Sequence, residues 1–208
     1  MAETNGTINL NNLDVELIVD KSGSMGSNKD TPTGQTRFEY AQETAVALAA
    51  QTAPFDPDGI TVTVFAGKWR TYENTTPETV ARIFQENVPM GSTNTEGVLR
   101  ARLDAYFARK AAGTARSTVF LVLTDGTPDS EPALVNLIIE ASRKLDRDEE
   151  VAIQFIQIGR DAAATAFLQR LDDQLVSQGA KFDIVDSHPI TDVEDLTPAE
   201  LIEKAFAD

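Results

Sequence analysis

Apolar residues alternate along this chain between short continuous runs and longer segments with helical spacing. Residues 119–123 are apolar at every position, which indicates a strand covered on both faces of a sheet. In residues 38–49, by contrast, apolar side chains recur every three or four positions, as on the buried face of a helix. Because the two patterns alternate from end to end, we expect an α/β fold with a doubly wound, mostly parallel sheet and helices on both faces.

The same patterns give the expected position of each element. Strands are expected at residues 15–19, 60–65, 69–72, 119–123, 153–158 and 182–185. Helices are expected at residues 38–49, from Thr76, after Thr95, at 134–145, at 167–175 and from Thr197. The tight turn at residues 66–68 predicts a hairpin, and therefore one antiparallel edge strand. Residues 26–36 and 186–195 are expected to be loops.

Length, composition and charge limit the classes of protein to which this chain can belong. The 208 residues suit a single domain, with its core at about 13–207 after an N-terminal extension of residues 1–12. The sequence contains no cysteine, which excludes thiolate metal sites and cysteine nucleophiles. A formal net charge of −15 argues against binding to nucleic acid. Neither a signal peptide nor an apolar run of membrane-spanning length is recognisable, so we expect a cytoplasmic protein without membrane contact.

Three polar loops follow predicted strands or precede a predicted helix. The first is 20–25, the second is 91–95 and the third is 124–129. In a doubly wound sheet, loops at the carboxyl ends of the strands converge on one crevice. They would bring together two carboxylates and several hydroxyls, which are hard oxygen donors suited to a magnesium-like ion. The carboxylates of Asp20 and Asp125 balance a divalent charge, so the ion would remain electrophilic and keep water that a partner's carboxylate could displace.

These loops resemble the metal-ion-dependent adhesion site of von Willebrand factor A domains. The similarity rests on Asp20-x-Ser22-x-Ser24, on Thr93 in Gly-x-Thr-Asn-Thr, and on Asp125 in Thr-Asp-Gly after an apolar strand. It implies the sheet order 3-2-1-4-5-6 with an antiparallel edge at the third strand. It also implies a metal ion, Mg²⁺ or alternatively Mn²⁺ or Ca²⁺. The five implied metal-binding residues are Asp20, Ser22, Ser24, Thr93 and Asp125.

The resemblance further implies a protein-interaction module of a bacterial intracellular type, not an enzyme, whose metal binds an acidic side chain of a partner protein. Thr95 is expected to cap the following helix. Asp129 is expected either to support the site or to cap the helix that starts near Pro132. Gly23 and Gly126 are expected to permit backbone turns that a side chain would hinder.

Other functions remain as alternatives. The metal could be purely structural within a larger assembly. An aspartate-based phosphohydrolase would use Asp20 as nucleophile, but the position of its general acid holds Ser22, which cannot protonate a leaving group at neutral pH. A serine hydrolase is disfavoured because there is no Gly-x-Ser-x-Gly motif and because the single histidine, His188, is expected in a solvent-facing loop.

Overall fold

A computed structural model describes residues 13–31, 34–52, 56, 59–193 and 195–206. These residues form one six-stranded sheet with the order β3-β2-β1-β4-β5-β6. The strands are β1 (Leu13–Asp20), β2 (Ile60–Phe65), β3 (Trp69–Thr75), β4 (Ser117–Thr124), β5 (Val151–Gln157) and β6 (Val185–Pro189). Only the pairing of β2 with β3 is antiparallel, so the predicted fold class, order and edge are confirmed.

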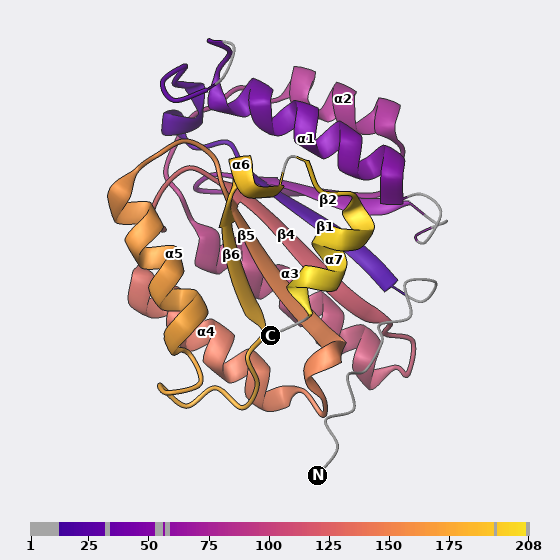
Figure 1. Cartoon of the computed structure of the whole chain (residues 1–208). Helices are drawn as coiled ribbons and strands as arrows, with labels where there is room; N and C mark the ends of the chain where they lie inside the picture. The colour runs from indigo at the N-terminus through magenta and orange to yellow at the C-terminus, as the bar shows by residue number, and fades with distance from the viewer. Residues whose placement is uncertain (1–12, 32–33, 53–55, 57–58, 194, 207–208) are drawn as a thin grey trace.

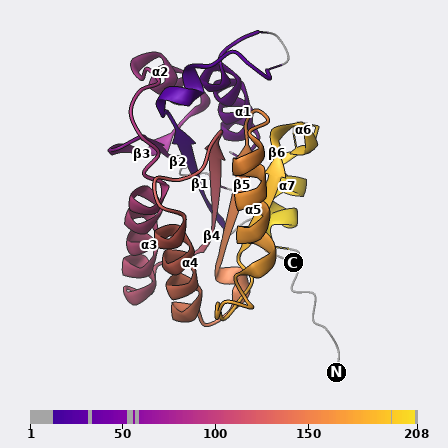
Figure 2. The ribbon, with the colours of Figure 1, turned by 90° about the vertical axis from the view of Figure 1, so that its left-hand side faces the viewer.

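Helices cover both faces of this sheet, as Figures 1 and 2 show. They are α1 (Arg37–Thr52), α2 (Pro77–Glu86), α3 (Thr95–Ala111), α4 (Glu131–Lys144), α5 (Ala162–Gln174), α6 (Ile190–Val193) and α7 (Pro198–Ala205). One hydrophobic cluster packs α1, α2, α6 and α7 against the sheet, and a second packs α3, α4 and α5 against the other face. Within β1, Leu17 and Val19 belong to the first cluster and Ile18 to the second, as strand geometry requires.

Several local signals in the sequence form the expected contacts. The hairpin turn joins β2 to β3, with Phe65 opposite Trp69. The Thr76 hydroxyl caps α2 by accepting from the backbone N–H of Thr79. At α7, Thr197 and Glu200 form both halves of a capping box. Among the described residues, no helix is long and apolar enough to cross a membrane.

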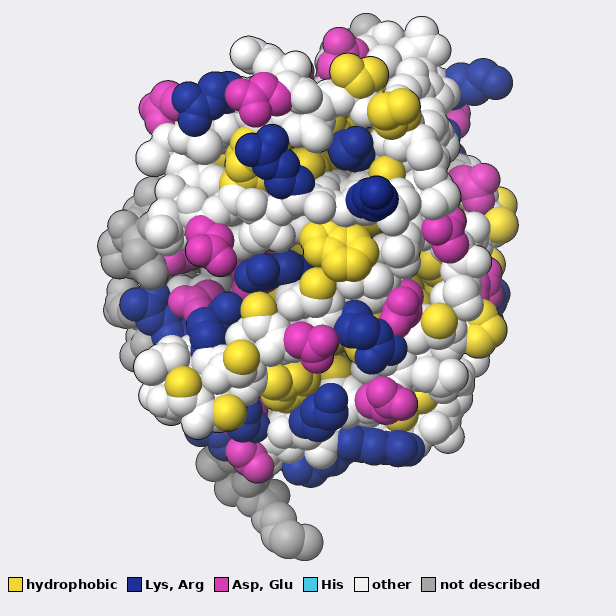
Figure 3. Space-filling model, turned by 180° about the vertical axis from the view of Figure 1, so that it is seen from behind, with side chains coloured by type: hydrophobic (Ala, Val, Ile, Leu, Met, Phe, Trp, Pro, Cys, Tyr) yellow, Lys and Arg dark blue, Asp and Glu magenta, His cyan; other side chains and the backbone are white. Residues whose placement is uncertain are grey.

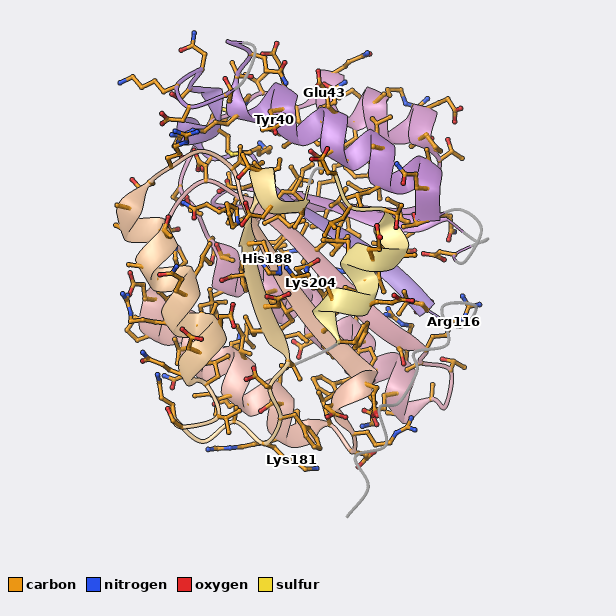
Figure 4. The ribbon with its side chains drawn as sticks, viewed as in Figure 1. Tyr40, Glu43, Arg116, Lys181, His188 and Lys204 are labelled. Carbon is orange, nitrogen blue, oxygen red and sulfur yellow. The ribbon has the colours of Figure 1, made fainter. Side chains whose placement is uncertain are left out.

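The C-terminal strand lies further along the chain than expected. It spans Val185–Pro189 instead of 182–185, and α6 follows it directly, so the predicted loop at 186–195 is wrong. Figure 4 accordingly places His188 on β6 and not in a loop. The His188 ring nitrogen Nε2 lies 2.7 Å from Oδ2 of Asp186, which also accepts from the side-chain amide of Gln154. These polar side chains pair with one another, although Oε1 of Gln154 is buried without a hydrogen-bond partner among the described residues. A strand that carries such polar residues is missed by a search for apolar residues.

Candidate metal centre

The site begins where the two central strands end side by side. β1 and β4 are parallel neighbours, and Val19 is in register with Leu123. Asp20 follows Val19 directly and Asp125 comes two positions after Leu123, so both are brought to the same edge of the sheet. Both carboxylates are almost completely buried. Buried carboxylates require hydrogen bonds or a cation, so their partners define the chemistry of the site.

Asp20 is held by donors on both of its oxygens. Oδ1 accepts from the backbone N–H of Ser22 at 2.6 Å, and Oδ2 accepts from the Thr124 hydroxyl at 2.8 Å. Burial nevertheless raises the pKa of Asp20 to about 6, although these hydrogen bonds oppose the rise and the charge of Asp125 adds to it. The hydrogen bonds therefore compensate the buried charge only in part, and a nearby cation would favour the ionised form.

Two serine hydroxyls connect the first loop to the second carboxylate. The hydroxyl oxygens of Ser22 and Ser24 lie 3.1 Å apart. The Ser24 hydroxyl donates to Oδ1 of Asp125 at 2.8 Å. Ser22 is buried, whereas Ser24 is exposed to solvent. The structure thus brings four of the five predicted residues into one cluster with a side open to solvent.

The loop that contains Thr93 lies against this cluster through its backbone. The N–H of Gly23 donates to the carbonyl of Gly91 at 3.1 Å, and the N–H of Met90 donates to the carbonyl of Lys21 at 2.7 Å. Gly91 has a φ of +93°, a conformation that strongly favours glycine. The close approach of the two loops therefore depends on Gly91.

The expectation for Gly23 and Gly126 is wrong. A Cβ added at Gly23 would come no closer than 3.8 Å to another residue, and one at Gly126 would meet nothing within 4 Å. Neither residue has a positive φ. A side chain would therefore fit at both positions.

Thr93 itself is positioned by Asp129 of the third loop. The Thr93 N–H donates to Oδ1 of Asp129, and the Asp129 N–H donates back to the Thr93 carbonyl, both at 2.8 Å. Asp129 does not cap α4; Ser130 does, by accepting from the N–H of Ala133. No hydrogen bond among the described residues joins the Thr93 hydroxyl to the serines, so Thr93 lies in the adjoining loop without a direct link to the cluster.

The predicted cap of α3 is also wrong. The capping side chain belongs to Asn94, whose Oδ1 accepts from the N–H of Gly97 at 3.0 Å. Thr95 is the first residue of the helix and is buried. Asn and Thr both cap helices, and neighbouring positions are not distinguished by spacing alone.

One residue at the site was not found in the sequence. Arg37, the first residue of α1, donates through Nη1 to Oδ2 of Asp125 at 2.6 Å. It lies 88 positions from Asp125 and in none of the three loops. The signal that could have identified it is a lone cation at the start of a helix that follows the first loop.

The cluster suits a hard divalent cation rather than a thiophilic one. Its donors are carboxylate and hydroxyl oxygens, the ligands that Mg²⁺ and Mn²⁺ prefer. Within the described part of the chain, no three His, Cys, Asp or Glu side chains gather as metal ligands. A metal here would therefore depend on two carboxylates, hydroxyls and water, which fits the donor set predicted from the sequence.

Solved structures with a similar fold share little sequence with this chain. The manganese-loaded TRAP protein of Plasmodium vivax has a TM-score of 0.59 and 16% identity, over 94% of this chain and 75% of that one. The vWF domain of the type V pili tip protein Mfa5 from Porphyromonas gingivalis has a TM-score of 0.55 and 11% identity, over 94% and 96%. Proximal thread matrix protein 1 from the mussel byssus has a TM-score of 0.54 and 16% identity, over 93% and 46%. At these identities the likeness shows the fold alone.

Family membership rests on the sequence itself. No curated protein is significantly similar to this chain. The signature of the vWA-TerF-like family, described as the vWA found in the TerF C terminus, matches residues 12–208. That range contains the whole described sheet and all five predicted metal-binding residues. The resemblance to von Willebrand factor A domains is therefore confirmed, and the chain belongs to the vWA-TerF-like family.

Proposed function

We propose that residues 1–208 form one metal-dependent protein-interaction module, with its core at about 13–207. A divalent cation, Mg²⁺ or alternatively Mn²⁺ or Ca²⁺, would be held by Asp20, Ser22, Ser24, Thr93 and Asp125. It would bind a carboxylate of a partner protein. The observation that carries this proposal is the hydrogen bond from Ser24 to Asp125, since it joins the loops after β1 and β4 around two buried carboxylates.

The exposure of the donors favours binding of a partner over a closed structural site. The two carboxylates are buried, but Ser24 is exposed and Thr93 is partly exposed. An ion held at this edge would keep a side open to solvent, where a partner's carboxylate could replace water. Similarity to a manganese-loaded protein makes Mn²⁺ a reasonable test ion, although at 16% identity only the fold is shared.

The chain's charge is consistent with a protein partner. The net charge of −15 opposes binding to phosphate backbones. On the face seen in Figure 3, basic and acidic side chains are interspersed, so this face has no single basic patch for nucleic acid. Two further points stay predictions: the cytoplasmic location, expected because no signal peptide is recognisable, and the bacterial intracellular type that the resemblance implies. Fractionation of the native cells would test the location.

An enzymatic function is not part of this proposal. A phosphohydrolase of the aspartate type needs a second acid two residues after Asp20, and Ser22 holds that position with its hydroxyl directed to Ser24. If the chain were such an enzyme, it would release phosphate from a generic phosphate ester in the presence of Mg²⁺. No such release is expected.

Capture of partners with and without metal tests the proposal. The full chain is immobilised and exposed to native cell extract in Mg²⁺ or in chelator, beside the Asp125→Ala variant. We expect partners that are lost both in chelator and with Asp125→Ala, while circular dichroism shows that the fold is retained. Partners that remain bound under both conditions would contradict the metal bridge and favour the structural alternative.

A further inference from the structure

Arg37 lies beside the proposed metal site but belongs to none of its three loops. Its Nη1 donates to Oδ2 of Asp125 at 2.6 Å, and its side chain is only 12% exposed. Oδ1 of the same carboxylate accepts from the Ser24 hydroxyl. The two oxygens of Asp125 therefore have different partners: Oδ2 pairs with the guanidinium, and Oδ1 accepts from the Ser24 hydroxyl.

The guanidinium is confined to this position by the loop after β5. Gly159 has a φ of +84°, and a Cβ added there would lie 2.7 Å from Arg37 Nε. Any side chain at position 159 would thus displace the guanidinium. Nε itself is buried and has no hydrogen-bond partner among the described residues. An unsatisfied buried donor is unfavourable, so the contact with Asp125 must compensate for it.

The charges at the site show what Arg37 changes. Asp20 and Asp125 alone would neutralise a divalent ion completely. The guanidinium offsets one of these carboxylate charges, so an ion at the site would keep excess positive charge. Asp30, whose carboxylate lies 3.5 Å from Arg37 Nη2, is 44% exposed, and solvent screens its contribution.

We propose that Arg37 is a built-in counter-charge that leaves the metal incompletely neutralised and so couples metal binding to the binding of an anionic ligand. This inference rests on the proposed metal-binding function. Without a ligand, the nearby guanidinium weakens the site's hold on the cation. When a carboxylate binds, it supplies the missing negative charge and the cation is retained more tightly. Arg37 acts through Asp125 and the local field, and it is a positioning residue of the site.

Binding of Mn²⁺ to the full chain tests this inference. The chelator-stripped protein is compared with Arg37→Gln, which removes the charge, and with Arg37→Lys, which keeps it. A second series repeats the titrations in sodium acetate against sodium chloride at equal ionic strength, with acetate as the carboxylate probe. Arg143→Gln is the matched control, because Arg143 lies in the last turn of α4, at the opposite end of the sheet.

We expect Arg37→Gln to bind Mn²⁺ about tenfold more tightly than wild type, and Arg37→Lys and Arg143→Gln to bind it as wild type does. Acetate should tighten Mn²⁺ binding in wild type and Arg37→Lys more than in Arg37→Gln. Circular dichroism verifies that each variant is folded.

Two results would overturn the inference, and they are distinguishable. If wild type binds Mn²⁺ but Arg37→Gln binds it equally or more weakly, or if acetate acts equally on both, Arg37 is no counter-charge and the metal function stands. If neither wild type nor any variant binds Mn²⁺, the proposed metal function fails and this inference fails with it.

Discussion

The Ser24 hydroxyl donates a hydrogen bond to Oδ1 of Asp125 at 2.8 Å, joining residues 101 positions apart in the chain. This contact links the loop after β1 to the loop after β4. A hydroxyl and a carboxylate held together in this way form a natural pair of ligands for a hard cation. We therefore expect the two oxygens to face the ion when metal binds.

Removing the Ser24 hydroxyl should weaken metal binding without unfolding the protein. Ser24 is exposed, so Ser24→Ala leaves no buried cavity. We expect Mn²⁺ affinity to fall by about tenfold or more. Ser27→Ala in the same segment is the control, since within the described part of the chain the Ser27 hydroxyl is hydrogen-bonded only by the N–H of Lys29. Calorimetric titration measures the Mn²⁺ affinity of both variants. Equal losses of affinity in the two variants would argue against a specific role for Ser24.

The two threonines of the second loop should differ in their effects. Thr93→Val removes the hydroxyl proposed to bind metal and should lower Mn²⁺ affinity by about tenfold. Thr95→Val removes a hydroxyl from the buried first residue of α3, where Asn94 supplies the cap. It should leave Mn²⁺ affinity unchanged. Paired titrations measure both, and the reverse order of effects would mean that the wrong threonine was assigned.

The pKa of Asp20 makes the free energy of unfolding of the metal-free protein depend on pH in a specific way. The pKa is raised from 3.8 to about 6 in the folded chain, chiefly by burial. Between these values the folded state binds more protons than the unfolded state, so the free energy of unfolding falls as the pH rises. From pH 4 to pH 7 this group alone should lower it by about 2 kcal/mol.

Urea unfolding at several pH values measures this effect. Asp20→Asn cannot titrate and should lack this part of the decline. Saturating Mg²⁺ should also reduce the decline in wild type, because the cation favours the charged carboxylate. If the free energy of unfolding fell equally with pH in wild type and in Asp20→Asn, Asp20 would not titrate in this range.

A buried ion pair away from the proposed site should affect stability alone. Arg102 Nε donates to Oε2 of Glu16 at 2.6 Å, and both residues are buried. Glu16 precedes Asp20 by four residues of β1, or about 13 Å. Arg102→Met would leave Glu16 with Arg109 as its remaining partner and should cost about 3 kcal/mol of unfolding free energy.

This variant separates stability from metal binding. Its Mn²⁺ affinity should equal that of wild type, as measured by titration of the folded protein at low temperature. If Arg102→Met lost Mn²⁺ affinity as well as stability, metal binding would depend on overall stability and not on the loop residues themselves. In that case the effects of the loop variants would lose their specific meaning.

The apolar strands and the three loops were predictable because their signals are local. A continuous apolar run such as 119–123 is typical of a covered strand at this length, and Asp125 follows it after Thr124. The missed elements lack such signals. β6 can carry polar residues because the side chains of Asp186 and His188 pair with each other. A strand of this kind has no apolar pattern by which to recognise it.

Contacts between distant residues were beyond the sequence. The bond from Arg37 to Asp125 depends on how α1 starts relative to β4, and that geometry exists only in the fold. For Asp129 the sequence left two roles open, and only the fold shows that Asp129 accepts from the Thr93 N–H while Ser130 caps α4. The cap of α3 was misplaced by one residue because Asn94 and Thr95 are both suitable, and only the backbone decides which side chain reaches Gly97.

The central claim is that Asp20 and Asp125 hold a divalent cation. Its most direct test is a calorimetric titration of chelator-stripped protein with Mg²⁺ and with Mn²⁺, beside the Asp20→Ala variant. The proposed function predicts saturable binding of one ion per chain in the wild type and none in a folded Asp20→Ala protein. No binding in the wild type, or equal binding in the variant, would contradict it.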